Sequence, residues 1–380
     1  MHPLITTVAS FWQRVQTTLF PYLTSVDLPL TPQLERLVLI LEVLRVEEGV
    51  TARRPHQPGA PPHERGALAR AFVVKAFLNL PGNKALWQRL QTDDTLRRLC
   101  GWATRGQVPS ESTFSRAFAR FADLGLADFV HERAVRGWLG DTLVWHQAVD
   151  ATDIAARETP RPNPAPQYGH TRSGKRRKHA VSGRRSGRPK KGEVVAPPPT
   201  RIARQGSQVP EIALLEVPTA CDTGAKPDPD GHLKYWKGYK FHVVTNEDGL
   251  PLCAVTTAAS VHDSQVAIPL LQLTARRVTA LYDLLDRGYD AAAIRAASTA
   301  LGHVPIIPEV ERPTRPAAEV EADRARHYTG RTVAERFNAD LKDNRGGEQV
   351  RVRGHRKVHA HLMFGLLVIF ADALLRLTPL

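Results

Sequence analysis

The sequence predicts an α/β protein: a mixed sheet flanked by helices, an all-helical N-terminal region and a basic flexible insertion. Three observations support this. Helix-start signals and apolar residues at helical spacing fill the first 130 or so residues. After Ile212, runs of strand formers alternate with helical patterns. Between the two regions lies a long polar stretch. The chain has 380 residues, 42% of them hydrophobic, which is enough for a packed core.

Residues 1–135 are interpreted as a helical domain. Thr31 can cap a helix whose first residue is Pro32, and leucines then recur at helical spacing. Further helices are expected from about 64 to 80 and from Asn83. Another begins at Ser110, with an aromatic side made by three residues, Phe114, Phe118 and Phe121.

Arg116 and Arg120 lie on a face next to these aromatic residues. Short helices that end in one with paired arginines fit a helix-turn-helix module, in which both side chains contact DNA. The alternative is a helical bundle with a solvated basic face. The basic balance of the whole chain favours DNA contact.

Residues 158–210 read as a basic insertion that is disordered in isolation. No acid occurs between Glu158 and Glu193, and the stretch carries two runs of Lys and Arg. Gly187-Arg188-Pro189 partly resembles a minor-groove AT-hook, but Ser186 stands where that pattern has Arg. We therefore expect Arg188 to bind DNA, through plain phosphate contact more than through groove recognition.

The second half predicts strands and helices in a mixed order. A strand over 143–150 ends at Asp150, and a hairpin joins strands 237–245 and 250–257 through a turn at Asn246–Gly249. A helix from Ser264 to about 273 follows, and then a strand over 278–285 with apolar residues in both phases, which indicates a central position. A helix over 291–301 and a strand over 303–307 complete the sheet.

A last amphipathic pattern spans Tyr328 to Lys342. At about 100° per residue, four polar residues of this stretch share an arc of roughly 60°. They are Tyr328, Arg331, Glu335 and Lys342. Three apolar residues fall on the opposite face: Val333, Phe337 and Leu341. A single helix would thus pack against a core and present a carboxylate, two cations and a phenol to an anionic partner.

Three acidic residues, Asp150, Asp286 and Glu335, are the candidate catalytic and metal-binding residues; we call them the carboxylate triad. Carboxylates that leave adjacent strand ends can converge with one on a nearby helix. Such a set can hold two Mg²⁺ ions about 3.5–4 Å apart, one at the attacking oxygen and one at the leaving oxygen. Mg²⁺ prefers oxygen ligands, and Mn²⁺ is able to substitute.

Rival assignments stay open at this point. Asp153 could replace Asp150, and Asp283 could replace Asp286 from the other face of the sheet. Thr332-Val-Ala-Glu335 also fits a capping box, which would tie Glu335 to a backbone N–H. His262-Asp263 could be catalytic, but capping of the following helix by Asp263 and Ser264 explains the pair as well.

Composition narrows the class of partner. A formal net charge of +14 points to a polyanion, and nucleic acid is the first candidate. The three cysteines lack CxxC spacing, which fits a reducing cytosol, and no signal-peptide pattern is seen at the N-terminus. The apolar stretch 362–375 is interrupted by Asp372 and is too short to span a membrane, so we expect a buried C-terminal helix.

These residues together resemble the DDE-type transposases of bacterial insertion sequences, in the group with a Tyr-Arg-Glu-Lys signature. Asp150 matches the first Asp of the family's Asp-x-Thr strand end, and Asp286-Arg-Gly-Tyr289 matches its Asp-x-Gly-Tyr motif. The signature itself is matched at every spacing by Tyr328, Arg331, Glu335 and Lys342. The resemblance extends to three other stretches: Gly238–His242, His262–Ser264 and Val352–His359.

The resemblance implies a ribonuclease-H-like catalytic domain over 140–380, interrupted by the insertion. It implies Mg²⁺-dependent cleavage at transposon ends followed by strand transfer. Tyr328, Arg331 and Lys342 would contact phosphates of double-stranded DNA, both ends and target. A homodimer in the bacterial cytoplasm, associated with the nucleoid and with no membrane, is expected. Asp286 and Glu335 are only 49 residues apart (335 − 286), which leaves no room for the β-rich insertion of some relatives.

Two other hypotheses compete with an active transposase. One is a non-catalytic DNA-binding relative, and the other is a nuclease of the same fold that performs no strand transfer.

Overall fold

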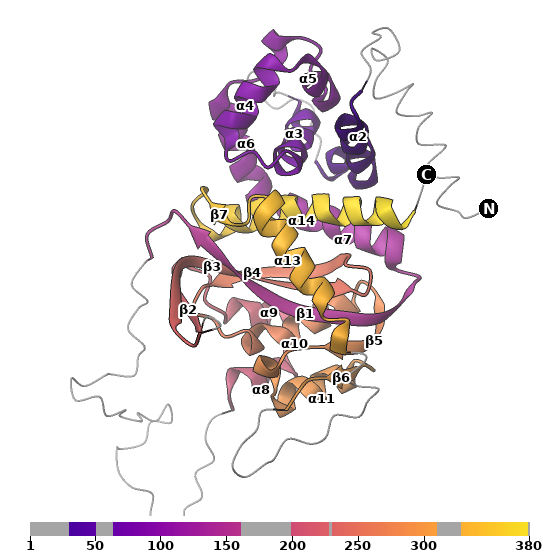
Figure 1. Ribbon diagram of the computed structural model, residues 1–380, viewed down its shortest axis with the longest axis vertical. Coiled ribbons are helices and arrows are strands. Elements are labelled where there is room, and N and C mark those ends of the chain that lie inside the picture. The colour runs from indigo at the N-terminus through magenta and orange to yellow at the C-terminus, as the bar shows by residue number, and fades with distance from the viewer. Residues whose placement is uncertain (1–29, 51–63, 161–198, 228–229, 310–327, 379–380) are drawn as a thin grey trace, which may run out of the picture.

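A computed structural model of the protein describes residues 30–50, 64–160, 199–227, 230–309 and 328–378. In Figure 1, helices α2 to α6 form the uppermost layer, α7 and α14 lie beneath them, the sheet follows, and α8 to α11 cover its far side. The mixed architecture and the helical N-terminal region confirm the predicted fold class.

The N-terminal layer comprises α2 (Pro32–Leu44), η2 (Val46–Gly49), α3 (Arg65–Phe77), α4 (Asn83–Thr92), α5 (Asp94–Cys100), η3 (Arg105–Gln107), α6 (Glu111–Leu124) and α7 (Leu126–Leu139). The start of α2 follows the predicted signal, because Thr31 Oγ1 accepts a hydrogen bond from the Leu34 N–H. The predicted aromatic side of α6 packs around Phe72, with rings in edge-to-face contact.

The strands are β1 (Leu143–Ala156), β2 (Asp222–Pro227), β3 (Leu233–Asn246), β4 (Pro251–Ala258), β5 (Thr279–Leu284), β6 (Val304–Ile306) and β7 (Gln349–Val350). Within the described residues they form one sheet of order β2-β3-β1-β5-β6, with β4 beside β3 and β7 beside β1. β1 runs antiparallel to β3 and parallel to β5. The predicted hairpin is confirmed as β3 and β4, joined by the turn at Asn246–Gly249.

The expected end of the first strand at Asp150 was wrong. β1 continues to Ala156 because β3 pairs with it as far as Ala155. Its pairing with β5, however, stops at Ala148. Asp150 therefore sits just past the last β1–β5 pair, where the edge of β1 opens on the β5 side.

The remaining helices are α8 (Arg201–Gln205), α9 (Pro210–Leu215), α10 (Ser264–Ala275), η4 (Arg287–Tyr289), α11 (Ala292–Ala300), α13 (Thr332–Asn344) and α14 (His355–Leu377). α8 lies inside the segment expected to be flexible. Gln205 is buried there, and its Nε2 donates to the Gln265 carbonyl of α10. The segment predicted to be flexible, 158–210, therefore extends too far at its C-terminal end. Residues 161–198 lie outside the described part of the chain.

The last helix, α14, is the centre of the core. Among the described residues it alone is long and apolar enough to cross a membrane, but 89% of its apolar window is buried inside the protein. This confirms the expected buried C-terminal helix. One hydrophobic cluster joins α14 to the N-terminal helices and to one sheet face, and its strand residues include Ile154, Tyr239 and Phe241. The N-terminal layer and the sheet thus share a core.

Candidate active site

Asp150 is fixed by the middle strand of the sheet. Its backbone pairs with Val243 of β3, and its side chain is 14% exposed. Asn338 of α13 donates a hydrogen bond from Nδ2 to Asp150 Oδ2 at 2.9 Å. The helix therefore holds one oxygen of this carboxylate, and the other faces Arg331.

Asp286 lies two residues past the end of β5 and caps the short helix η4. Its Oδ1 accepts a hydrogen bond from the Gly288 N–H at 2.7 Å, and Tyr289 is buried beneath. A Cβ at position 288 would lie 2.9 Å from that same Oδ1, so any larger residue there would force the carboxylate to shift. The Asp-x-Gly-Tyr motif thus combines a carboxylate, the space it needs and an aromatic anchor.

Glu335 belongs to the first turn of α13, and 59% of its side chain is exposed. The predicted single helix over 328–342 was wrong, because Gly330 and Arg331 form a turn and α13 begins at Thr332. The predicted apolar seam holds, since Phe337 and Leu341 are buried. The capping box does not form: within the described residues α13 has no side-chain cap, and Glu335 accepts from Arg331 instead.

Arg331 lies among the three carboxylates of the triad. Its guanidinium nitrogens are 3.6 Å from Asp150 Oδ1, 3.8 Å from Asp286 Oδ2 and 3.2 Å from Glu335 Oε1. One cation thus brings together side chains from β1, from the end of β5 and from α13. This arrangement is the central geometric fact of the site.

Electrostatics agree with this convergence. Burial raises the pKa of Asp150 to about 6; Arg331 lowers it, and the charges of Asp286 and Glu335 raise it. Burial also raises the pKa of the Tyr328 phenol, which feels Arg331 and the same three carboxylates. Tyr328 is therefore close to the triad despite the break in the helix.

The rival carboxylates lie elsewhere. Asp153 accepts hydrogen bonds from Lys226 and Lys342, and these outweigh the effect of its burial and bring its pKa to about 2. Asp283 is completely buried. Its oxygens accept from Gln147 Nε2 and Ser298 Oγ, both at 2.6 Å. Neither carboxylate faces Arg331.

The prediction that Asp263 caps α10 was wrong. Its carboxylate accepts a hydrogen bond from Lys240 Nζ at 2.8 Å, and within the described residues α10 has no side-chain cap. His262 Nδ1 lies 2.8 Å from Ser264 Oγ instead. The pair therefore links β3 to the start of α10.

The structure brings some predicted DNA-binding residues to the triad and leaves others apart. Tyr328 and Arg331 lie at the triad, whereas Lys342 binds the rival carboxylate Asp153. Arg116 and Arg120 are exposed on α6, in the helical layer beyond α14 (Figure 1). Arg188 lies outside the described residues.

Sequence reasoning missed Asn338, which lies three residues after Glu335. This is one helical turn, so the two side chains share a face, and that spacing was the available signal. Asn338 Oδ1 is buried with no hydrogen-bond partner among the residues described. This oxygen is therefore an unused hydrogen-bond acceptor next to Asp150, as far as the described residues are concerned.

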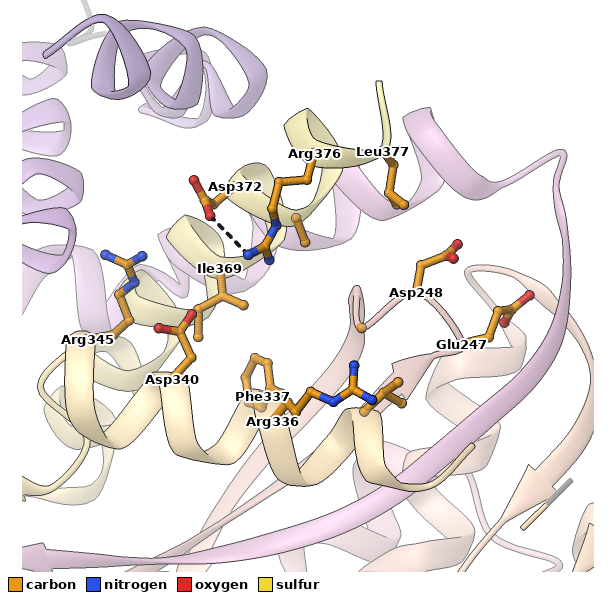
Figure 2. A pocket seen from close by; sticks show the side chains of 13 residues that line it. Glu247, Asp248, Arg336, Phe337, Asp340, Arg345, Ile369, Asp372, Arg376 and Leu377 are labelled. Carbon is orange, nitrogen blue, oxygen red and sulfur yellow. Dashed lines mark ion pairs between the residues drawn. The ribbon is translucent and has the colours of Figure 1, made fainter. Parts of the chain in front are cut away.

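The opposite side of α13 borders a separate hollow, shown in Figure 2. It is a cavity of about 460 Å³ between α13, the end of α14 and the turn at Glu247–Gly249. Both signs of charge line it, and Arg376 pairs with Asp372. None of the triad residues lines this cavity, so it is distinct from the candidate site.

The donor set of the triad suits a hard cation such as Mg²⁺, because it consists of carboxylate oxygens that already converge on one cation. The orphaned Asn338 oxygen adds a further acceptor for a hydrated ion. In this arrangement, no group of three or more His, Cys, Asp or Glu in the described part of the chain stands close enough together to hold a metal. Arg331 occupies the middle of the triad, so metal binding requires it to move.

Comparison with known proteins identifies the class. Residues 28–120 match the family described as Transposase domain (DUF772), and residues 202–371 match the Transposase DDE domain. The chain is 28% identical over 203 residues to the putative transposase for insertion sequence element IS402 of Burkholderia cepacia. That alignment covers 50% of this chain and 71% of the relative. No solved structure matches. Both matched models describe transposase domains, and together with this relative they support a DDE-type transposase of an insertion sequence.

Proposed function

We propose that this transposase binds the terminal inverted repeats of its own element and catalyses metal-dependent strand cleavage followed by strand transfer. The observation that carries the proposal is the single guanidinium shared by Asp150, Asp286 and Glu335. Carboxylates from three elements gain nothing from such crowding unless a cation joins them, because like charges repel.

The triad would hold Mg²⁺, with Mn²⁺ as a substitute. When bound, the metal would polarise the scissile phosphate and activate the attacking oxygen. Asn338 would keep one oxygen of Asp150 in place through its 2.9 Å hydrogen bond, so that the other stays directed at the centre of the site. Glu335, as the most exposed member, would complete the site on the open side.

Arg331 would act first as the counter-ion of the triad and then as a phosphate ligand. Its planar fork suits bidentate contact with a backbone phosphate, and Lys342 offers a point charge. Tyr328 would donate its phenol hydrogen to a phosphate oxygen, because its raised pKa keeps the proton in place. DNA and metal would therefore replace Arg331 together at the triad.

The partner would be double-stranded DNA, at the element's ends and at the target, in the cytoplasm. Because an element has two ends, we expect two copies of the chain to act together. The exposed Arg116 and Arg120 are candidates for contact with the end outside the cleavage site, and the same is proposed for Arg188.

The test uses a duplex that carries the inverted repeat found next to the gene, with Mg²⁺ and the full chain. Cleaved ends and joined products are expected from the natural sequence, and neither from Asp286→Asn. Asp343→Asn, which removes an exposed carboxylate of α13, is the matched control and should cleave normally. Binding without cleavage by the natural sequence would indicate an inactive relative. Cleavage without joined products would indicate a nuclease.

A further inference from the structure

Asp153 holds two lysines from different parts of the chain. Lys226 Nζ of β2 lies 2.5 Å from Asp153 Oδ1, and Lys342 Nζ of α13 lies 2.9 Å from the same oxygen. The two ammonium groups are therefore no more than the sum of these distances, 5.4 Å, apart. Three elements, β1, β2 and α13, meet at this oxygen.

The charges of this cluster do not balance. Among the described residues, two cations face one carboxylate, and at this separation the ammonium groups repel each other. Half of the Lys226 side chain is exposed, and a quarter of that of Lys342. An ammonium group has three donors, and one is used at Asp153. The contacts of the described part of the chain leave the remaining donors and one unit of positive charge for an anion on the surface.

An ordinary surface ion pair explains the cluster less well. Exposed pairs contribute little to stability, and a second lysine on the same oxygen adds repulsion. Ordering two flexible side chains before a ligand arrives lowers the entropic cost of binding that ligand. A phosphodiester group carries one negative charge and two free oxygens, which matches two ammonium groups a few ångströms apart.

The position of the cluster points to DNA. Lys342 lies seven residues after Glu335 on α13, which is two turns along one face of the helix and about 10 Å. Each strand of a duplex places one phosphate every 3.4 Å or so along the helix axis. A strand whose scissile phosphate lies at the triad would therefore bring a phosphate roughly three nucleotides away to the lysines.

We propose that Lys226 and Lys342, positioned by Asp153, form a seat for one backbone phosphate of the DNA strand that enters the active site. The proposal rests on the proposed function. Lys226 is the new contact, and Asp153 is a positioning residue that orders both lysines. The seat reads no sequence and fixes the register of the strand relative to the triad.

The test measures DNA binding without metal, so that its result does not depend on cleavage. Fluorescence anisotropy with a duplex carrying the terminal inverted repeat gives Kd over a range of salt concentrations. Lys226→Ala should weaken binding about three- to tenfold and reduce the slope of log K against log salt by about one. Lys237→Ala is the matched control and should change Kd less than twofold. Lys237 is an exposed lysine of β3 that leaves the strand on the face opposite to Lys234, the residue paired with Lys226.

The phosphate is located with duplexes in which one phosphate at a time is replaced by an uncharged methylphosphonate. The natural chain should lose affinity most at one position roughly three nucleotides from the cleavage site. In the Lys226→Ala variant, methylphosphonate at that position should cause no further loss of affinity. Methylphosphonates at the other positions should weaken binding as much as they do in the natural chain. Asp153→Asn should weaken the same position while the unfolding temperature shows that the chain stays folded.

Two results would overturn the seat and leave the proposed function standing: Lys226→Ala binds like Lys237→Ala, or its losses add to those of every methylphosphonate equally. Failure of the natural chain to bind the inverted repeat would instead count against the proposed function itself.

Discussion

Asp150 and Asp153 are three residues apart on β1 and have similarly exposed side chains, but their pKa values are shifted in opposite directions. Their side chains are 14% and 17% exposed. Burial dominates at Asp150 and raises its pKa to about 6, because its cation is shared with two more carboxylates. At Asp153 two lysines outweigh burial and bring the pKa to about 2. Burial raises the pKa of both carboxylates, and the charges of their partners decide whether that rise remains or is reversed.

The difference separates two uses of a carboxylate. Asp153 is satisfied by the folded chain and stabilises it. Asp150 is left short of positive charge, which destabilises the chain until a cation arrives. A metal-binding carboxylate is expected to resemble Asp150, and a positioning carboxylate is expected to resemble Asp153.

The largest expected effect is on cleavage. Asp150→Asn should lower the cleavage rate by at least about 10³-fold, as for loss of one member of a catalytic set. Asp153→Asn should lower it less than about tenfold, because its role is indirect. Single-turnover cleavage of the inverted-repeat duplex measures both. Equal losses in the two variants would break the contrast.

Asp283 provides a benchmark for a carboxylate that the fold satisfies completely. Asp283→Ala leaves Gln147 and Ser298 without their acceptor in a dry site and should lower the free energy of unfolding by about 2–4 kcal/mol. Asp286→Ala, at a more exposed turn, should cost about 1 kcal/mol or less. Urea unfolding compares the two, and the reverse order would contradict the assignment of Asp286.

The pH dependence of stability should have opposite signs at the two β1 carboxylates. Asp150 has a raised folded pKa, so its contribution favours folding below about pH 4 and is lost as pH rises through 6. Asp153 has a depressed pKa, so its contribution is present above about pH 4 and is lost as pH falls toward 2.

In metal-free buffer at pH 7, Asp150→Asn should therefore raise the free energy of unfolding by about 1–3 kcal/mol. Asp153→Asn should lower it by about 1–2 kcal/mol, after allowance for the exposure of Lys226. Unfolding midpoints measured from pH 4 to 8 test this. A gain, or no change, for Asp153→Asn would show that its lysine pairs add nothing.

The smallest effect concerns metal affinity without DNA. Arg331→Gln removes the cation that competes at the triad and should tighten Mn²⁺ binding about three- to tenfold. Lys342→Gln removes a cation from Asp153 and should leave Mn²⁺ binding unchanged. Titration calorimetry with each variant makes the comparison, and an equal response would mean that Arg331 has no special place.

The sequence carried much of this arrangement in local signals. Proline and threonine at the start of α2, the turn of the β3–β4 hairpin and the apolar periodicity of α13 each act over a few residues. The position of Asp286 just past the end of β5 followed from the order of elements. These features could be predicted because neighbours in the sequence determine them.

What local patterns could not show are contacts between distant segments. Asn338 meets Asp150 across 188 residues, and Lys226 meets Asp153 across 73. The continuation of β1 beyond Asp150 depends on β3, and the burial of Asp283 depends on residues of β1 and α11. The turn at Gly330–Arg331 interrupts a stretch whose side chains follow a regular 3.6-residue pattern. Periodicity alone cannot detect such an interruption.

The sharing of α14 bears on how such proteins can diversify. One apolar helix packs against α2, α3, α6 and α7 and also against β4 and α13. A hybrid that joined the helical layer of one relative to the sheet of another would therefore put a foreign surface against this helix. New end specificities are more accessible through exposed side chains such as Arg116, or through paired changes along α14, than through wholesale exchange of modules.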